Sequence, residues 1–262
     1  MDDGDLILGT AAGYHFGDVR PFLRSLNESG YAGRIVLFVS ETTRGLEGMA
    51  DLGADLLPLT RPSRLVRLPC NALRHFRYLE HLESAPERYG RILLTDVRDV
   101  IFQSDPFART WADGLHCVLE DRRMTLGACP HNSRWIRGHL GEDALARLAD
   151  RPISCSGTTL GGHDAVVRYL RALTALLLPF AGGERMAGFD QAAHNLLVHE
   201  QPPCAVTLHD NAGPVLTLGH TCGEPALDAE GRVLNETGER AVIVHQYDRK
   251  PELFGKIRKR YA

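Results

Sequence analysis

Short, almost uninterrupted apolar runs alternate with segments of helical spacing through the first hundred residues. The apolar runs, each with the length and composition of a buried strand, are residues 6–10, 34–39, 54–59 and 91–95. The helical segments are residues 18–29, 46–52 and 71–83. Asp18 is expected to cap the first helix, and Gly30 to end it. Strands that are apolar throughout and separated by helices are typical of a mostly parallel sheet with helices on both faces.

The second half of the chain is less regular. Short apolar runs predict strands at residues 117–119, 153–160, 205–208, 215–217 and 241–244. Helical spacing predicts helices at residues 165–178 and 190–198. No repeat, low-complexity linker or block of charge interrupts the sequence. The pattern therefore predicts a single α/β domain over residues 1–262.

Composition narrows the class of protein. Hydrophobic residues make up 44% of the chain and charged residues 24%, which excludes collagen, a coiled coil and wholesale disorder. A net charge of -3 leaves no basic footprint for nucleic acid. The most apolar stretch, residues 172–181, is half of the ~20 residues that a transmembrane segment needs.

The chain ends and the cysteines bear on location. The acidic start, residues 1–5, lacks the positive charge of a signal peptide, and the six cysteines show no C-x-x-C spacing. A cytoplasmic protein with reduced thiols is expected. The three lysines, Lys250, Lys256 and Lys259, all lie in the last thirteen residues. The last turn, residues 256–261, is basic enough to contact an anionic inner membrane face if the substrate is lipid-linked.

The strongest local signal is acidic and follows the fourth apolar run. Asp96 and Asp99 stand where that strand ends, the position at which open α/β sheets bind ligands. Two carboxylates there can converge on a hard divalent cation such as Mg²⁺ or Mn²⁺. The alternative is an acidic turn in which Arg98 neutralises its neighbours. Further on, Asp105 is expected to cap a helix with Pro106 at its first position.

Residues 93–102, Leu-Leu-Thr-Asp-Val-Arg-Asp-Val-Ile-Phe, resemble the Asp-x-Asp segment of GT-A fold glycosyltransferases, particularly family 8 and its bacterial relatives. The resemblance implies a nucleotide-sugar donor and Mn²⁺ (or Mg²⁺) held by the acidic segment. The spacing here is Asp-x-x-Asp. The apolar residues that follow align Asp99 with the direct metal ligand and place Asp96 near the metal or the ribose.

Two further segments resemble the same family in the same order. Residues 154–158 are similar to its Asn-Ser-Gly strand, which implies that Ser156 lies along the donor sugar, although Cys155 stands where Asn is usual. Residues 188–195 resemble its Asp-Gln-x-x-x-Asn segment, which implies that Asp190 and Gln191 lie at the transferred sugar. Asp190 is also a candidate helix N-cap, and the two roles can coexist.

A last segment, residues 244–251, is similar to the family's His-x-x-Gly-x-x-Lys-Pro segment. The resemblance implies that His245 completes the metal site and that Lys250 contacts the diphosphate. Asp248 and Arg249 break the usual spacing, so His245 is the firmer assignment.

The donor's other end is expected near the first strand. Small residues after Thr10 let the backbone approach a base, and Tyr14 can stack on it; an ordinary turn is the alternative. Arg74 and Arg77 lie on the helix before the acidic strand, where the family often aims an arginine at the diphosphate. The alternative for each is a surface arginine, the usual basic residue of this chain.

Together these segments predict a metal-dependent glycosyltransferase, with a UDP-sugar donor and retention of configuration. Residues 1–110 would form the nucleotide-binding half and residues 111–262 the sugar and acceptor half. The acceptor would be a carbohydrate, a lipid-linked molecule or a natural product, bound by loops within residues 121–152 and 209–240. The alternatives are a metal-dependent phosphohydrolase or nucleotidyltransferase, and a non-catalytic nucleotide-sugar-binding module. An inverting enzyme would add a base, for which the candidates are Asp164, Glu184 and Asp210.

Overall fold

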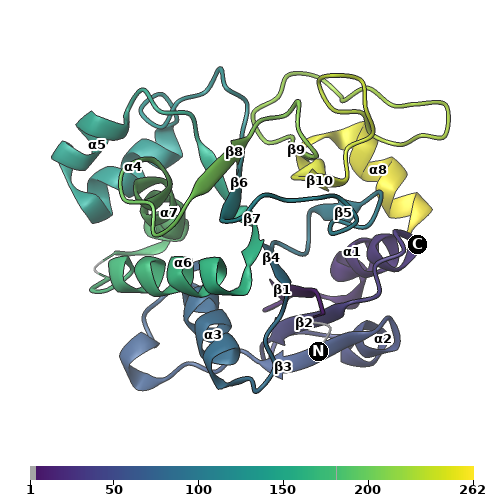
Figure 1. Cartoon of the computed structure of the whole chain (residues 1–262), viewed down its shortest axis with the longest axis horizontal. Coiled ribbons are helices and arrows are strands. Elements are labelled where there is room, and N and C mark those ends of the chain that lie inside the picture. The colour runs from purple at the N-terminus through teal and green to yellow at the C-terminus, as the bar shows by residue number, and fades with distance from the viewer. Residues whose placement is uncertain (1–3, 181) are drawn as a thin grey trace.

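The protein is built on a twisted central sheet with helices on both faces (Figure 1). The computed structural model describes residues 4–180 and 182–262, except for the side chain of Glu184. Within these residues the main sheet has seven strands in the order β3-β2-β1-β4-β7-β6-β8. Its strands are β1 (Leu6–Thr10), β2 (Arg34–Val39), β3 (Ala54–Pro58), β4 (Arg91–Thr95), β6 (Leu115–Leu119), β7 (Ser154–Gly162) and β8 (Val206–His209).

The sheet is mostly parallel, as predicted. β1, β2, β3 and β4 run parallel to one another, and β8 runs parallel to β6. β7 is the exception, because it is antiparallel to both of its neighbours, β4 and β6. A smaller sheet beside it has the order β5-β10-β9, with strands β5 (Val100–Phe102), β10 (Ile243–His245) and β9 (Val215–Thr217).

The alternating side chains of the strands feed a separate core on each face. On one face, Leu6 and Leu8 pack with α3, α6 and α7. On the other, Ile7 packs with α1 and α2. The helices are α1 (Phe16–Glu28), α2 (Leu46–Asp51), α3 (Cys70–Ser84), α4 (Pro130–Leu140), α5 (Glu142–Leu148), α6 (His163–Leu176), α7 (Phe189–His199) and α8 (Pro251–Arg260), with single 3₁₀ turns at Ser63–Leu65, Glu184–Met186 and Tyr247–Arg249. None of the helices in the described ranges is long and apolar enough to cross a membrane.

Two expectations about caps are wrong in detail. The N-cap of α1 is His15, whose ring accepts a hydrogen bond from the backbone N–H of Gly17, while Asp18 sits inside the first turn and accepts from the N–H of His15. Asp105 begins no helix. Its carboxylate instead accepts from the N–H of Phe107 at 2.8 Å, which closes a tight turn before Pro106 can start a helix.

Several elements have no counterpart in the sequence-based prediction. α4 and α5 occupy most of residues 121–152, a stretch expected to be loop, and α8 covers the basic end of the chain. β5 follows Asp99 directly and pairs with β10 in antiparallel register, His245 opposite Val100. This pairing brings the end of the chain back to the acidic strand exit.

Candidate active site

A cavity of about 670 Å³ opens where β1 and β4 end and antiparallel β7 begins. Because β7 runs the other way, its first residues lie at the same sheet edge as the last residues of β1 and β4. Eight of the residues that line the cavity were predicted as site residues, namely Thr10, Tyr14, Arg74, Asp96, Asp99, Ser156, Asp190 and Gln191. Segments far apart in sequence therefore meet in one cavity.

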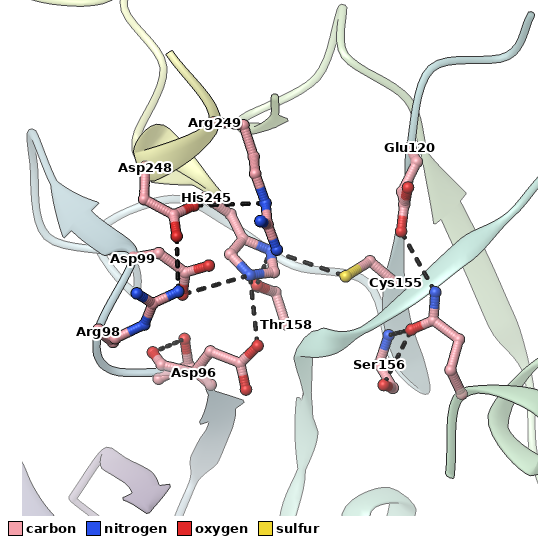
Figure 2. Close-up of polar contacts among 12 residues, drawn as sticks. Asp96, Arg98, Asp99, Glu120, Cys155, Ser156, Thr158, His245, Asp248 and Arg249 are labelled. Atoms are coloured by element: carbon pink, nitrogen blue, oxygen red, sulfur yellow. Dashed lines mark hydrogen bonds and ion pairs between the residues drawn. The ribbon is translucent and has the colours of Figure 1, made fainter. Parts of the chain in front are cut away.

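Asp96, Asp99 and His245 form a cluster at one side of this cavity. One ligand atom from each lies within 4.8 Å of the others. His245 Nε2 is 3.5 Å from Asp96 Oδ2 and 4.0 Å from Asp99 Oδ1 (Figure 2). Asp96 directly follows β4, Asp99 precedes β5 and His245 ends β10, so the pairing of β5 with β10 is what assembles the cluster.

The donor atoms of this cluster fit a divalent cation. His245 is completely buried, and its Nε2 has no hydrogen-bond partner although it faces the two carboxylates. Its Nδ1 lies 3.4 Å from Thr158 Oγ1 and 3.8 Å from Cys155 Sγ, which orients the ring. A Cβ on Gly157 would overlap both the Asp96 carboxylate and the His245 ring. The space that Gly157 leaves, with two oxygen donors and one nitrogen, suits Mn²⁺ or Mg²⁺.

The charges of the cluster are strongly coupled. Burial would raise the pKa of Asp96, but the Arg74 guanidinium and His245 lower it far below its usual range. Burial raises the pKa of Asp99, and the nearby carboxylates of Asp96 and Asp248 add to the effect. Burial would lower the pKa of His245, but Cys155 and the two carboxylates raise it well above its ordinary value. A divalent cation would satisfy the same concentration of negative charge.

Arg74 joins this cluster to Asp190. Its buried guanidinium forms an ion pair with Asp96, and its Nη2 lies 3.5 Å from Asp190 Oδ2. His75 Nε2 is 3.4 Å from the same Asp190 oxygen. Burial would lower the pKa of Arg74, but Asp96 and Asp190 raise it, so the guanidinium stays charged. α3 thus supplies one cation that holds two acidic segments together.

Asp190 does not cap α7, contrary to one of the two roles expected of it. The N-cap of α7 is Gly188, with no side-chain hydrogen bond, and Asp190 is the second helical residue. Its side chain is 2% exposed and faces Arg74 and His75. The ion pair holds the carboxylate at the cavity wall, away from the backbone N–H groups of its own helix.

Gln191 is held at both ends of its amide. Its Oε1 accepts from the backbone N–H and the hydroxyl of Ser156, both at 3.0 Å, and its Nε2 donates to Glu120 Oε1 at 3.2 Å. Glu120 is buried, and its other oxygen lies 3.1 Å from His220 Nε2. Glu120 was missed in the sequence. It directly follows β6, in the way that Asp96 follows β4, and that position was the available signal.

The remaining predicted residues divide into two groups. Thr10 and Tyr14 line the cavity, with Thr10 Oγ1 hydrogen-bonded to the hydroxyl of Tyr78 at 2.8 Å. Arg77 pairs with Glu80 one turn along its own helix and is not part of the cavity wall. Lys250 also lies outside the wall, because its side chain is buried elsewhere.

Two of the three candidate bases of an inverting enzyme, Asp164 and Asp210, are not among the described residues that line the cavity. Asp164 is exposed and pairs with Arg88 at 2.7 Å, and Asp210 pairs with Arg122. The side chain of Glu184 lies outside the described residues. Among the described residues, the acidic side chains that line the cavity are Asp96, Asp99, Glu120 and Asp190.

Two of the solved structures that match the chain over almost its whole length are of the glycosyltransferase LgtC. The galactosyltransferase LgtC in complex with donor and acceptor sugar analogues is 11% identical, with a TM-score of 0.57 over 98% of this chain and 93% of its own. An active-site mutant of LgtC, with glutamine replaced by glutamate, is 12% identical, with a TM-score of 0.54 over 96% of this chain and 95% of its own. No family model and no curated protein matches the chain. At this identity the likeness shows the fold alone: the chain has a GT-A-like α/β fold, as the resemblance of its acidic segment implies.

Proposed function

We propose that this chain is a metal-dependent glycosyltransferase that moves a sugar from a UDP-sugar to an acceptor with retention of configuration. The observation that carries the proposal is the cavity itself. It combines the Asp96, Asp99 and His245 cluster with the Asp190–Gln191 pair, inside a GT-A fold. Neither the metal cluster alone nor the Asp190–Gln191 pair alone would favour sugar transfer over other metal-dependent chemistry.

Asp96, Asp99 and His245 would hold Mn²⁺ or Mg²⁺. When bound there, the cation supplies positive charge beside the diphosphate that leaves the donor. Arg74 keeps Asp96 ionised, and ionised carboxylates are the form that binds metal. In this reading Asp96 shares the metal with Asp99 and does not contact only the ribose, because both carboxylates face the same imidazole nitrogen.

Asp190 and Gln191 line the same cavity as Asp96 and Asp99, with Arg74 between Asp96 and Asp190, and would contact the transferred sugar. The anomeric carbon becomes oxocarbenium-like as its bond to the diphosphate breaks, and a fixed carboxylate or amide nearby can stabilise that charge. Both groups are held in place before substrate arrives, Asp190 by Arg74 and His75, and Gln191 by Ser156 and Glu120. Such preorganised groups lower the cost of reaching the transition state.

The two halves of the chain would bind different parts of the substrates. Residues 1–110 contribute Thr10 and Tyr14 to the cavity and would bind the nucleotide. Residues 111–262 would bind the sugar and the acceptor, and α4 contributes lining residues from this half of the chain. One LgtC structure contains analogues of a donor and an acceptor sugar. That supports a carbohydrate acceptor for this chain, free or attached to a lipid or natural product.

The direct test incubates the purified protein with a panel of UDP-sugars and Mn²⁺, with and without simple sugar acceptors, and measures the UDP released. We expect UDP release that EDTA abolishes and that Asp99→Ala and His245→Ala abolish. Proton NMR of the product's anomeric centre then reports retention or inversion. Release of phosphate or pyrophosphate in place of UDP would favour the phosphohydrolase or nucleotidyltransferase. UDP binding without turnover of any donor would favour a binding module.

A further inference from the structure

Lys250, to which the family resemblance assigns a contact with the diphosphate, makes its contacts inside the protein. Lys250 is 6% exposed, and its ammonium group donates to the backbone carbonyl of Thr221. The N-terminus of α8, which follows it, is also occupied: both oxygens of Glu224 accept from backbone N–H groups, those of Glu252 and Leu253, at 3.1 Å. Lys250 therefore anchors the loop before it and leaves the cavity without that cation.

Two arginines, unlike Lys250, line the cavity. Arg98 and Arg249 both line the cavity, and their side chains are 41% and 57% exposed. Asp248 lies between them (Figure 2). Its Oδ2 is 2.6 Å from Arg98 Nη2 and its Oδ1 is 3.5 Å from Arg249 Nε. Asp248 itself is 10% exposed, so it acts as the buried support of two accessible cations.

The backbone fixes this arginine pair beside the metal cluster. Arg98 directly precedes Asp99, and Arg249 lies one 3₁₀ turn after His245. The phenol of Tyr247 donates to the carbonyl of Arg98 at 2.9 Å, and the N–H of Tyr247 donates to the carbonyl of Asp99. The acidic turn and the 3₁₀ turn are thereby held side by side. The pair and the metal ligands border the same end of the cavity.

We propose that Arg98 and Arg249, supported by Asp248, form a second anion-binding subsite that contacts the diphosphate of the donor, and that Lys250 does not contact it. The proposal rests on the proposed function and names the residues that recognise its substrate. A departing nucleoside diphosphate carries more negative charge than one divalent cation offsets. Guanidinium groups match phosphate oxygens with paired N–H donors, which a single ammonium cannot do.

The experiment is calorimetric titration of UDP and of UMP, each with Mn²⁺, into wild-type protein, Arg98→Ala, Arg249→Ala and the matched control Lys250→Met. We expect each arginine variant to lose about tenfold or more in UDP affinity, the loss of one charged hydrogen bond. Their loss in UMP affinity should be smaller, because UMP lacks the second phosphate. Lys250→Met should keep the UDP affinity of the wild type and unfold at lower temperature.

The outcomes separate this inference from the function it depends on. If wild-type protein binds UDP but both arginine variants bind it equally well, or lose UDP and UMP affinity alike, the subsite assignment is overturned. Normal binding by the arginine variants together with lost UDP binding by a folded Lys250→Met would return the role to the lysine. If the wild type itself binds no UDP with Mn²⁺, the proposed function fails, and the subsite with it. Should Lys250→Met not fold, the two exposed arginines alone decide the question.

Discussion

Substitution of Arg74 is expected to lower the stability of the protein more than any other substitution in α3, because Arg74 is the buried cation that compensates two carboxylates. The Arg74 side chain is 11% exposed and that of Asp190 is 2% exposed. The guanidinium of Arg74 contacts Asp190 through one terminal nitrogen and Asp96 through the other. Removal of one partner from a buried ion pair costs about 3–5 kcal/mol, since the other charge stays buried without compensation. Arg74→Met keeps much of the side chain's volume and removes the charge. We therefore expect its unfolding free energy to fall by about that amount.

Arg77→Met is the matched control on the same helix. Arg77 pairs with Glu80. The Arg77 side chain is 16% exposed, but Glu80 is 60% exposed, so the carboxylate that Arg77→Met leaves behind stays hydrated and the pair contributes less than about 1 kcal/mol. Both variants are compared with the wild type by urea unfolding in EDTA, followed by circular dichroism. Equal stability of Arg74→Met and the wild type at neutral pH would refute the argument, as would an equal loss in Arg77→Met.

The pH dependence of the same variant provides an independent check. The pKa of Asp96 in the folded protein lies below its unfolded value, so its stabilisation is present above the unfolded pKa and is lost as pH falls through the folded pKa. Without Arg74, burial raises the pKa of Asp96, which then gains a proton on folding. The stability deficit of Arg74→Met should therefore be largest at neutral pH and shrink as the pH falls towards about 4. A deficit that grows on acidification would contradict this sign.

Three further variants test the cavity. Gly157→Ala should lower Mn²⁺ affinity about tenfold or more without removing a ligand, because its methyl group would push Asp96 and His245 apart. Titration with Mn²⁺ followed by electron paramagnetic resonance measures this affinity, and an unchanged affinity would contradict the metal cluster. Asp190→Asn should leave UDP affinity nearly intact while the rate of sugar transfer falls at least tenfold, with some loss of stability because the ion pair with Arg74 is lost. Calorimetry measures the UDP affinity and a turnover assay the transfer rate, and a loss of UDP affinity would contradict this role. Glu120→Gln should lower kcat about tenfold and leave UDP affinity unchanged, since it weakens the hold on the Gln191 amide; an unchanged kcat would make Glu120 merely structural.

The first half of the fold is predictable because its information is local. The strands β1, β2, β3 and β4 are apolar along their whole length, and the helices between them have the expected spacing, so their positions agree with the prediction to within a few residues. α4 and α5 were missed because their polar sequences carry a weaker pattern, and α4 buries few of its own residues. Asp105 failed as a cap because the same aspartate chemistry serves a tight turn equally well.

The candidate site was predictable as a set of residues but not as an arrangement. Asp96, Asp99 and His245 were expected to meet, and they do, although His245 lies some 150 positions along the chain. Glu120 and Arg98 were not assigned to the site. Their partners, His220, Gln191 and Asp248, come from other elements, and contacts between distant elements leave no local spacing to detect.

The sequence by itself determined the α/β class, the mostly parallel sheet and the acidic strand exit, because strand and helix periodicity and the position of a residue after a strand are local properties of the chain. The tertiary structure alone decided that β7 runs antiparallel, which brings Ser156 to the edge where β4 ends, and that β10 pairs with β5, which carries His245 to the two aspartates. It also decided that Lys250 turns inward to Thr221 while Arg249 faces the cavity. Those outcomes depend on which surfaces pack together and which charges find partners, and only the folded chain brings these into contact.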